Sequence, residues 1–420
     1  MKKIFLLAVI SFFTFNLFAQ TEYMVLAKKD GTTVNVKVAD VDSVTFATFY
    51  GEQLGNYAED NLAIDSYDME INPVTKVPTF FLQSSGVPAS VLELGATGFT
   101  NIGPKGITGV NSTSMLSLTF DANGVPYAYF LNTNKKSEVK KFADGAWTTV
   151  GAEFGTLTST GGATVTGSHD GIGVHANQPI VGFMSSQAIG ATARRTLTVS
   201  YFDGVEWLAD QNVAGVSANN YLVNVFNANG ILYCGFIQQG TGGSYKLYKY
   251  NGDFQWEKIT EFLPAGASQP NILLNEWVVS KDGKEIYLLM ASDAITNGVY
   301  FPTVFRYTVE TQKWTQVGAP LPSAGGANNQ SMQTASRQAL SLDAAGNPMV
   351  FYKDYDNNYY PTIVTLNPET RQWNTPIVLE SYSLGTKRIM LKSIEPGTQY
   401  ASYTKTVNGV LQLSVVKLNF

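Results

Sequence analysis

The strongest constraint on how this chain can fold is a strand-and-turn unit that recurs along it. The unit is clearest at Asp121–Gly151, which reads DANGVPYAYF, then a polar loop, SEVKKFADG and AWTTVG. Both halves alternate apolar and polar residues around Gly-containing turns, a pattern typical of antiparallel strands. Recurrence of such a unit every few tens of residues indicates a repeat architecture rather than a set of independent domains.

Further copies of the unit cover most of Leu62–Phe420, and each of the first six ends in a strand with a large aromatic residue. These residues are Phe99, Trp147, Trp207, Trp256, Trp314 and Trp373. The blades of a β-propeller diverge from its axis, so bulky residues on the outer strands fill the gaps between neighbours. We therefore predict an all-β fold, a seven-bladed β-propeller, with the tryptophans in the core. Six blades is the alternative if Leu62–Gly103 is not a complete blade.

The last unit offers only three strands, at Arg388–Ile394, Thr398–Thr404 and Val410–Leu418, and no aromatic strand follows them. A three-stranded end blade would leave a long edge exposed, which favours aggregation. The alternating strands of Tyr23–Val38 form a hairpin with no partner of their own. We expect a strand of this hairpin to close the ring from the N-terminus, and the polar stretch Gly51–Asn61 to be a linker.

The N-terminus has the features of a secretory signal peptide. Lys2 and Lys3 precede the short apolar run Ile4–Phe18, and the small residue Ala19 stands before Gln20. The predicted organisation is a signal peptide at 1–19, an N-terminal hairpin and linker at 20–61 and a β-propeller at 62–420. The protein is expected to be exported, to the periplasm or the cell exterior, with no second apolar segment long enough to span a membrane.

Charge and cysteine content narrow the function classes. Charged residues make up 15% of the chain, its net charge is −5, and the basic residues are scattered. Nucleic-acid binding needs a concentrated basic surface, so we expect no nucleic-acid partner. The single cysteine, Cys234, has no partner for an internal disulfide and is expected to be a small buried hydrophobe.

Loop length indicates where a ligand could bind. Connections between second and third strands, and between units, are longer than the other turns, and in an up-and-down blade both types emerge on one face. Function concentrates on loops carried by a rigid scaffold. The expected ligand-binding residues on this face are Arg337, Arg388, His169, Asn220, Tyr221, Tyr300, Tyr355, Tyr359 and Asn328. They offer hydrogen bonds and stacking surfaces to a glycan, although ordinary loop chemistry accounts for each one singly.

No motif for catalysis or metal binding is present. His169 and His175 are the only histidines, and no set of three zinc ligands is visible. Asp354–Asn358 opens like a calcium loop but lacks the Gly and the final Glu of an EF-hand. We expect no catalytic residue, metal or cofactor. The favoured hypothesis is a binding protein for a glycan or protein ligand; the alternatives are a glycan-active hydrolase or lyase, and a structural or envelope-assembly scaffold.

Parts of the repeat resemble known propeller families. Val304–Trp314 and Ile363–Trp373 resemble the second half of a kelch repeat, as in galactose-oxidase-type propellers, but without the kelch Gly-Gly pair. Ser200–Trp207 resembles the Asp-box of sialidases. The patterns Asp-x-x-Gly-x-Pro and Trp-x-x-Val-Gly are similar to those of secreted bacterial propellers of no established activity. These resemblances imply an architecture and no particular activity.

Overall fold

The computed structural model forms two compact units, Met1–Phe49 and Tyr50–Phe420. It describes residues 23–27, 33–37 and 51–419, except for 59–60, 97, 110–115, 135, 157–170, 190–191, 211–218, 240–241, 266, 268–269, 271–273, 297–298, 322–323, 325–337, 382–383, 385–387 and 396. The predicted signal peptide lies outside the described residues. Among them, no helix has the length and apolar character needed to cross a membrane.

The first unit contains the hairpin expected from the sequence. Strand β1 (Tyr23–Ala27) pairs antiparallel with β2 (Thr33–Lys37), with Met24 opposite Val36 and Leu26 opposite Val34. These two strands form a sheet of their own. The hairpin therefore does not supply the strand that closes the ring.

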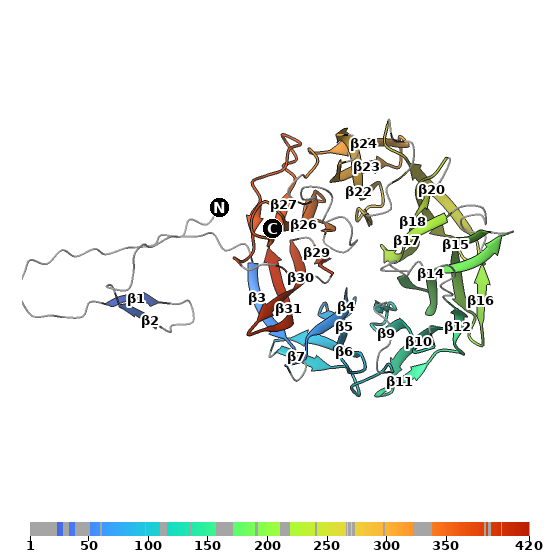
Figure 1. The fold of residues 1–420 in the computed structure, drawn as a ribbon, viewed down its shortest axis with the longest axis horizontal. Helices are drawn as coiled ribbons and strands as arrows, with labels where there is room; N and C mark the ends of the chain where they lie inside the picture. Colours follow the sequence, from blue (N-terminus) through green and yellow to red (C-terminus); the bar gives the residue numbers. More distant parts are fainter. Residues whose placement is uncertain are drawn as a thin grey trace, which may run out of the picture. The chain divides into compact units, whose positions relative to one another are not determined.

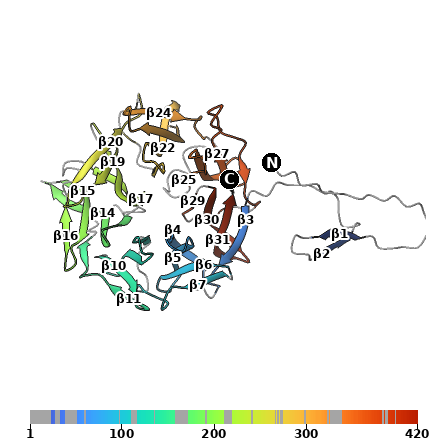
Figure 2. The same ribbon diagram turned by 180° about the vertical axis from the view of Figure 1, so that it is seen from behind.

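The second unit is a ring of seven antiparallel sheets, so the predicted seven-bladed β-propeller is confirmed (Figure 1, Figure 2). Six blades follow the chain order from the innermost strand outward, and the second has an additional short strand, β12. Their strands are β4 (Ile64–Ile71), β5 (Pro78–Ser84), β6 (Ser90–Gly95) and β7 (Gly98–Asn101); β8 (Leu116–Phe120), β9 (Pro126–Leu131), β10 (Lys136–Ala143), β11 (Ala146–Thr149) and β12 (Phe154–Thr156); β13 (Gly171–His175), β14 (Gln178–Ile189), β15 (Thr192–Phe202) and β16 (Trp207–Asp210); β17 (Asn219–Ala228), β18 (Ile231–Gln239), β19 (Ser244–Tyr250) and β20 (Trp256–Phe262); β21 (Asn275–Val279), β22 (Glu285–Thr296), β23 (Val299–Thr308) and β24 (Lys313–Val317); and β25 (Gln338–Leu342), β26 (Pro348–Asp354), β27 (Tyr360–Thr365) and β28 (Ile377–Val378).

The seventh blade joins the two ends of the ring. It contains β29 (Met390–Glu395), β30 (Thr398–Val407) and β31 (Val410–Asn419), and its fourth strand is β3 (Gly51–Tyr57). Closure by an N-terminal strand is thus confirmed, but the strand comes from the stretch that we expected to be a linker. Its sequence, GEQLGNY, looks like a linker because an outermost strand has much of its length exposed to solvent. Only Leu54 and Tyr57 pack against the core, where the Tyr57 ring lies 5.1 Å from that of Phe99.

The Asp-x-x-Gly-x-Pro pattern marks the turn between the first two strands of a blade. Asp121 Oδ1 accepts hydrogen bonds of 2.9 Å from the backbone N–H groups of both Asn123 and Val125. Gly124 follows with a φ of 80°, a conformation that costs glycine little. Asp343 and Gly346 make the same turn in the sixth blade. The motif is therefore a local turn signal.

The Trp-x-x-Val-Gly pattern marks the place where one blade docks on the next. Trp207 donates a 2.8 Å hydrogen bond from Nε1 to the carbonyl oxygen of Val150 in the preceding blade. A Cβ on Gly151 would lie only 3.0 Å from the Trp207 ring, so this position has to be glycine. Trp373 is held in the same way, against Gly318 and the carbonyl oxygen of Ala319. The five outer tryptophans, Trp147, Trp207, Trp256, Trp314 and Trp373, are partly buried against hydrophobic core clusters, which confirms their interpretation as core residues.

The ring has two faces, which are named here by their connections. We call the face with the turns between first and second, and third and fourth, strands the tight-turn face, and the opposite one the long-loop face. Two of the connections between second and third strands that we expected to be long loops, Ser185–Arg195 and Ala291–Tyr300, are instead largely extended strand ends. In Ser185–Arg195, β14 and β15 continue their pairing as far as Ile189 and Thr192, and β22 and β23 likewise extend through most of Ala291–Tyr300.

Candidate functional site

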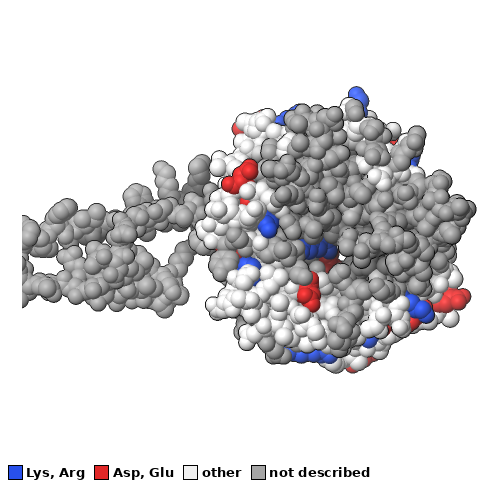
Figure 3. Space-filling model, in the orientation of Figure 1, with Lys and Arg blue, Asp and Glu red and all other residues white. Residues whose placement is uncertain are grey.

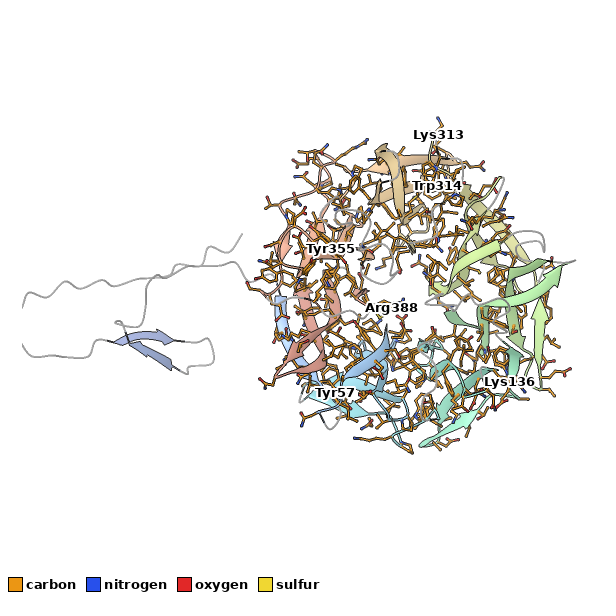
Figure 4. All side chains as sticks on the ribbon, viewed as in Figure 1. Tyr57, Lys136, Lys313, Trp314, Tyr355 and Arg388 are labelled. Carbon is orange, nitrogen blue, oxygen red and sulfur yellow. The ribbon has the colours of Figure 1, made fainter. Side chains whose placement is uncertain are left out.

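The inner strands of the ring surround a channel. A cavity of about 830 Å³ is lined by residues of β17, β21, β25 and β29. A smaller one of about 190 Å³, against β4, β8 and β13, shares Glu70, Asn224, Arg388 and Lys392 with it. Turn residues such as Asn229 also line the larger cavity, so it reaches the tight-turn face. Figure 3 shows the ring hollowed at its centre with charged side chains inside, and Figure 4 places Arg388 there.

Two ion pairs cross the junction between the seventh and first blades inside this channel. Arg388 Nη1 lies 3.0 Å from Asp68 Oδ1, and Lys392 Nζ lies 2.8 Å from Glu70 Oε2. The other oxygen of each carboxylate also accepts a hydrogen bond, from the backbone N–H of Leu118 to Asp68 and of Ile71 to Glu70. Both acids are therefore fully engaged, and the pairs join β29 to β4 where the ring closes.

Burial shapes the electrostatics of these pairs. Burial raises the pKa of the Asp68 carboxyl, although Arg388, Lys392 and the Leu118 N–H act in the opposite direction. Burial would lower the pKa of the Lys392 ammonium, but Glu70 and Asp68 raise it above its ordinary value. The buried Asp68 carboxylate therefore depends on its partners, whereas the side chains of Lys392 and Glu70 are 34% and 31% exposed.

Glu276 is the exception among the channel acids. It projects from β21 into the larger cavity, and its carboxyl makes no hydrogen bond or ion pair with any residue that the structure describes. Burial raises its pKa, opposed by the more distant positive charges of Arg388 and Lys392, while Asp68 raises it further. The amide of Asn224, on the adjacent inner strand β17, lines the same cavity. The channel therefore presents an acid and an amide to solutes.

A second set of ligand-type side chains lies on the long-loop face, in the connection between β26 and β27. The rings of Tyr355 and Tyr359 meet edge to face, 5.3 Å apart and at 86°. Lys353 Nζ lies 4.8 Å from the centre of the Tyr359 ring and donates a 3.3 Å hydrogen bond to the carbonyl oxygen of Leu384. Tyr359 is 46% exposed, so a ring that packs against Tyr355 and Lys353 is also offered to solvent.

The structure describes the side chains of four of the nine predicted site residues. It brings Tyr355 and Tyr359 together, and it places Arg388 in the channel with Asp68 as its partner. Asn220 is fully buried on β17. For Tyr221 on β17 and Tyr300 on β23 the described part is the backbone alone, and Arg337, His169 and Asn328 lie outside the described residues. A ligand site made of the nine residues stays a prediction.

Sequence reasoning missed the channel acids and Lys392. The signal was available in IDSYDMEI of β4 and NEWVV of β21, where Asp68, Glu70 and Glu276 interrupt otherwise apolar inner strands. An acid in the interior of a buried strand costs free energy unless it faces a polar partner or a water-filled channel. Within the described part of the chain, no group of three or more His, Cys, Asp or Glu residues could hold a metal ion.

No protein-family model matches the chain, and no curated protein sequence matches it. Among solved structures, the chain is similar to a protein of unknown function from Dyadobacter fermentans, with 10% identity, 88% of this chain and 99% of that chain covered, and a TM-score of 0.45. It is also similar to the Aleuria aurantia lectin, with 15% identity, 71% of this chain and 90% of the lectin chain covered, and a TM-score of 0.41. A polysaccharide lyase matches with 11% identity, coverages of 84% and 89%, and a TM-score of 0.48. Likeness at this level carries no argument on function, and the fold assignment rests on the strand pairing of the chain itself.

Proposed function

We propose that this protein is an exported propeller that binds a glycan through its long-loop face without chemically changing it. The observation that carries the proposal is the exposed ring of Tyr359, held edge to face by Tyr355 and backed by the ammonium of Lys353. Export rests on the signal-peptide pattern at Met1–Ala19. If export occurs, mass spectrometry of the mature protein will find Gln20 as its first residue.

The chemistry of a sugar suits such an arrangement. One face of a pyranose ring presents C–H groups that stack on an aromatic ring, while its edge presents hydroxyl groups to polar neighbours. Tyrosine supplies both a rigid apolar surface and a hydrogen-bonding hydroxyl at a low cost in conformational entropy. Because Tyr355 and Lys353 fix the Tyr359 ring before a ligand arrives, little further ordering is needed on binding.

The test is a glycan array probed with the mature protein, together with a reducing-sugar assay on every glycan that binds. Tyr359→Ala should weaken binding roughly tenfold or more, as truncation of a central aromatic contact does. Phe254→Ala is the matched control. Phe254 is 43% exposed and meets Tyr201 edge to face at 4.8 Å, but it lies in a turn of the tight-turn face.

Binding that falls with Tyr359→Ala and not with Phe254→Ala, without product release, supports the proposal. Release of reducing ends or unsaturated products would favour the glycan-active enzyme instead. An array without any binding would favour the scaffold, and equal losses in both variants would remove the assignment to the long-loop face.

A further inference from the structure

Some polar groups in the central channel have no partner in the part of the chain that the structure describes. The carboxyl of Glu276 and the amide of Asn224 have no hydrogen-bond partner among the described residues, although both line the 830 Å³ cavity. Arg388 uses Nη1 for Asp68, and its other N–H groups have no acceptor within the described part of the chain. These groups come from three different inner strands or their ends, and they face one shared space.

A purely structural role explains the ion pairs but not Glu276. Asp68 and Glu70 each accept hydrogen bonds from a cation and from a backbone N–H, so they stabilise the junction between β4 and β29. Glu276 makes no comparable contact with any residue that the structure describes, and it is only partly buried, so a solute in the cavity can reach its carboxyl. Acids with a perturbed pKa in a cavity are enriched at functional sites, and a ligand in this cavity would give the Glu276 carboxyl a partner.

The charges around Glu276 decide which ligand fits. Arg388 and Lys392 on the β29 side are neutralised by Asp68 and Glu70 on β4, pair by pair. The inner strands next to Glu276 add no ionisable group to the cavity: β17 contributes Asn224, and β25 contributes Ala339 to Leu342. Lys76, Lys281 and Asp343 also line the cavity, but they lie in turns of the tight-turn face, beyond the ends of the inner strands. Once the two pairs cancel, Glu276 is the charge on the described inner strands of this cavity that has no described partner. A positively charged group of the ligand would compensate it.

We propose that the central channel is a second binding site, for a small polyhydroxylated solute that carries a protonated amine. Glu276 pairs with the ammonium group, and Asn224 and the outward N–H groups of Arg388 hydrogen-bond the hydroxyl groups. A cavity of about 830 Å³ has the size of typical small-molecule sites, which range from about 300 to 1,000 Å³. This site lies on the channel axis and is independent of the tyrosine pair on the long-loop face.

The test uses three sugars that differ at one position: D-glucosamine, D-glucose and N-acetyl-D-glucosamine. Their binding to the mature protein is measured by NMR titration at about pH 6, where an aliphatic amine next to polar groups is still protonated. We expect saturable binding of glucosamine. The two uncharged sugars should bind at least about tenfold more weakly, because each lacks one charge-assisted hydrogen bond. Glu276→Gln should weaken glucosamine binding by a similar factor.

Glu310→Gln is the control variant, because Glu310 is an exposed acid in the turn between β23 and β24, outside the channel. It should leave glucosamine binding unchanged, and so should Tyr359→Ala, which separates this site from the glycan site. Gln is nearly isosteric with Glu, and an unchanged circular dichroism spectrum will show that Glu276→Gln is folded. The proposal is wrong if glucose binds as tightly as glucosamine, if Glu276→Gln binds normally, or if no sugar binds at up to about 50 mM.

Discussion

Replacement of Gly318 by alanine tests how the blades are held together. Gly318 has a φ of 65°, and a Cβ at this position would lie 2.5 Å from Trp373 Nε1 and 2.7 Å from Cε2. The added methyl group would push away the Trp373 ring, whose Nε1 donates a 2.6 Å hydrogen bond to the carbonyl oxygen of Ala319.

The expected magnitude has two parts. An alanine with positive φ costs about 1–2 kcal/mol. Loss of the Trp373 hydrogen bond and part of its packing adds about 1–3 kcal/mol. Gly283→Ala isolates the first part, because Gly283 lies in the same blade with a φ of 72° and no atom lies within 4 Å of its added Cβ. The difference between the two variants therefore measures the docking of Trp373.

The free energies come from urea unfolding followed by far-ultraviolet circular dichroism, with midpoints compared at a common slope. In a Trp373→Ala background the extra cost of Gly318→Ala should disappear, because the clashing ring is gone. If Gly318→Ala destabilises the protein no more than Gly283→Ala, or if the extra cost survives in that background, the docking argument is refuted.

Three further predictions follow from the ring and the channel. A protein that begins at Tyr50 should melt at the same temperature as the mature protein. A protein that begins at Ala58 lacks β3 and exposes the edge of β31, so it should melt at a lower temperature or aggregate. Thermal denaturation with light scattering tests both. Burial raises the pKa of the Glu276 carboxyl above its ordinary value of 4.5, so the free energy of unfolding of the wild type should fall as pH rises from that value through the folded pKa. Glu276→Gln should be more stable than wild type above this pH window and equal to it below. Urea unfolding at a series of pH values measures the difference. Cys234 is fully buried, and burial raises the pKa of its thiol. It should therefore react with a thiol reagent only in denaturant. Rapid reaction in the native protein would contradict this burial.

The fold was predictable where its determinants are local. The turn at Asp121 and Gly124 is formed by residues within five positions of one another, and five of the six tryptophans follow the third strand of their own unit. Such signals can be read from the sequence without knowledge of neighbouring blades. The count of seven blades followed from them.

The closing strand and the channel were harder to predict from the sequence because the residues that determine them are far apart along the chain. Nothing in GEQLGNY indicates β31 as its partner, since its outward residues are polar and Leu54 and Tyr57 meet a core built by other strands. In the same way, the pairing of Asp68 with Arg388 joins positions 320 residues apart, so neither side chain alone reveals the other. The tyrosine pair was found because both of its members lie in one short connection.

The position of β3 also sets an order of events for this chain. Gly51 lies opposite Leu418, so the first strand of the propeller to leave a ribosome or a translocation channel pairs with the last. Joining two points about 367 residues apart in an unfolded chain costs roughly 5 kcal/mol in entropy, comparable to the whole net stability of many domains. Blades that fold between β3 and β31 shorten this loop. We therefore expect β3 to remain unpaired until those blades have formed. Closure is then the final step of folding, and the release of β3 from β31 is the first step of unfolding.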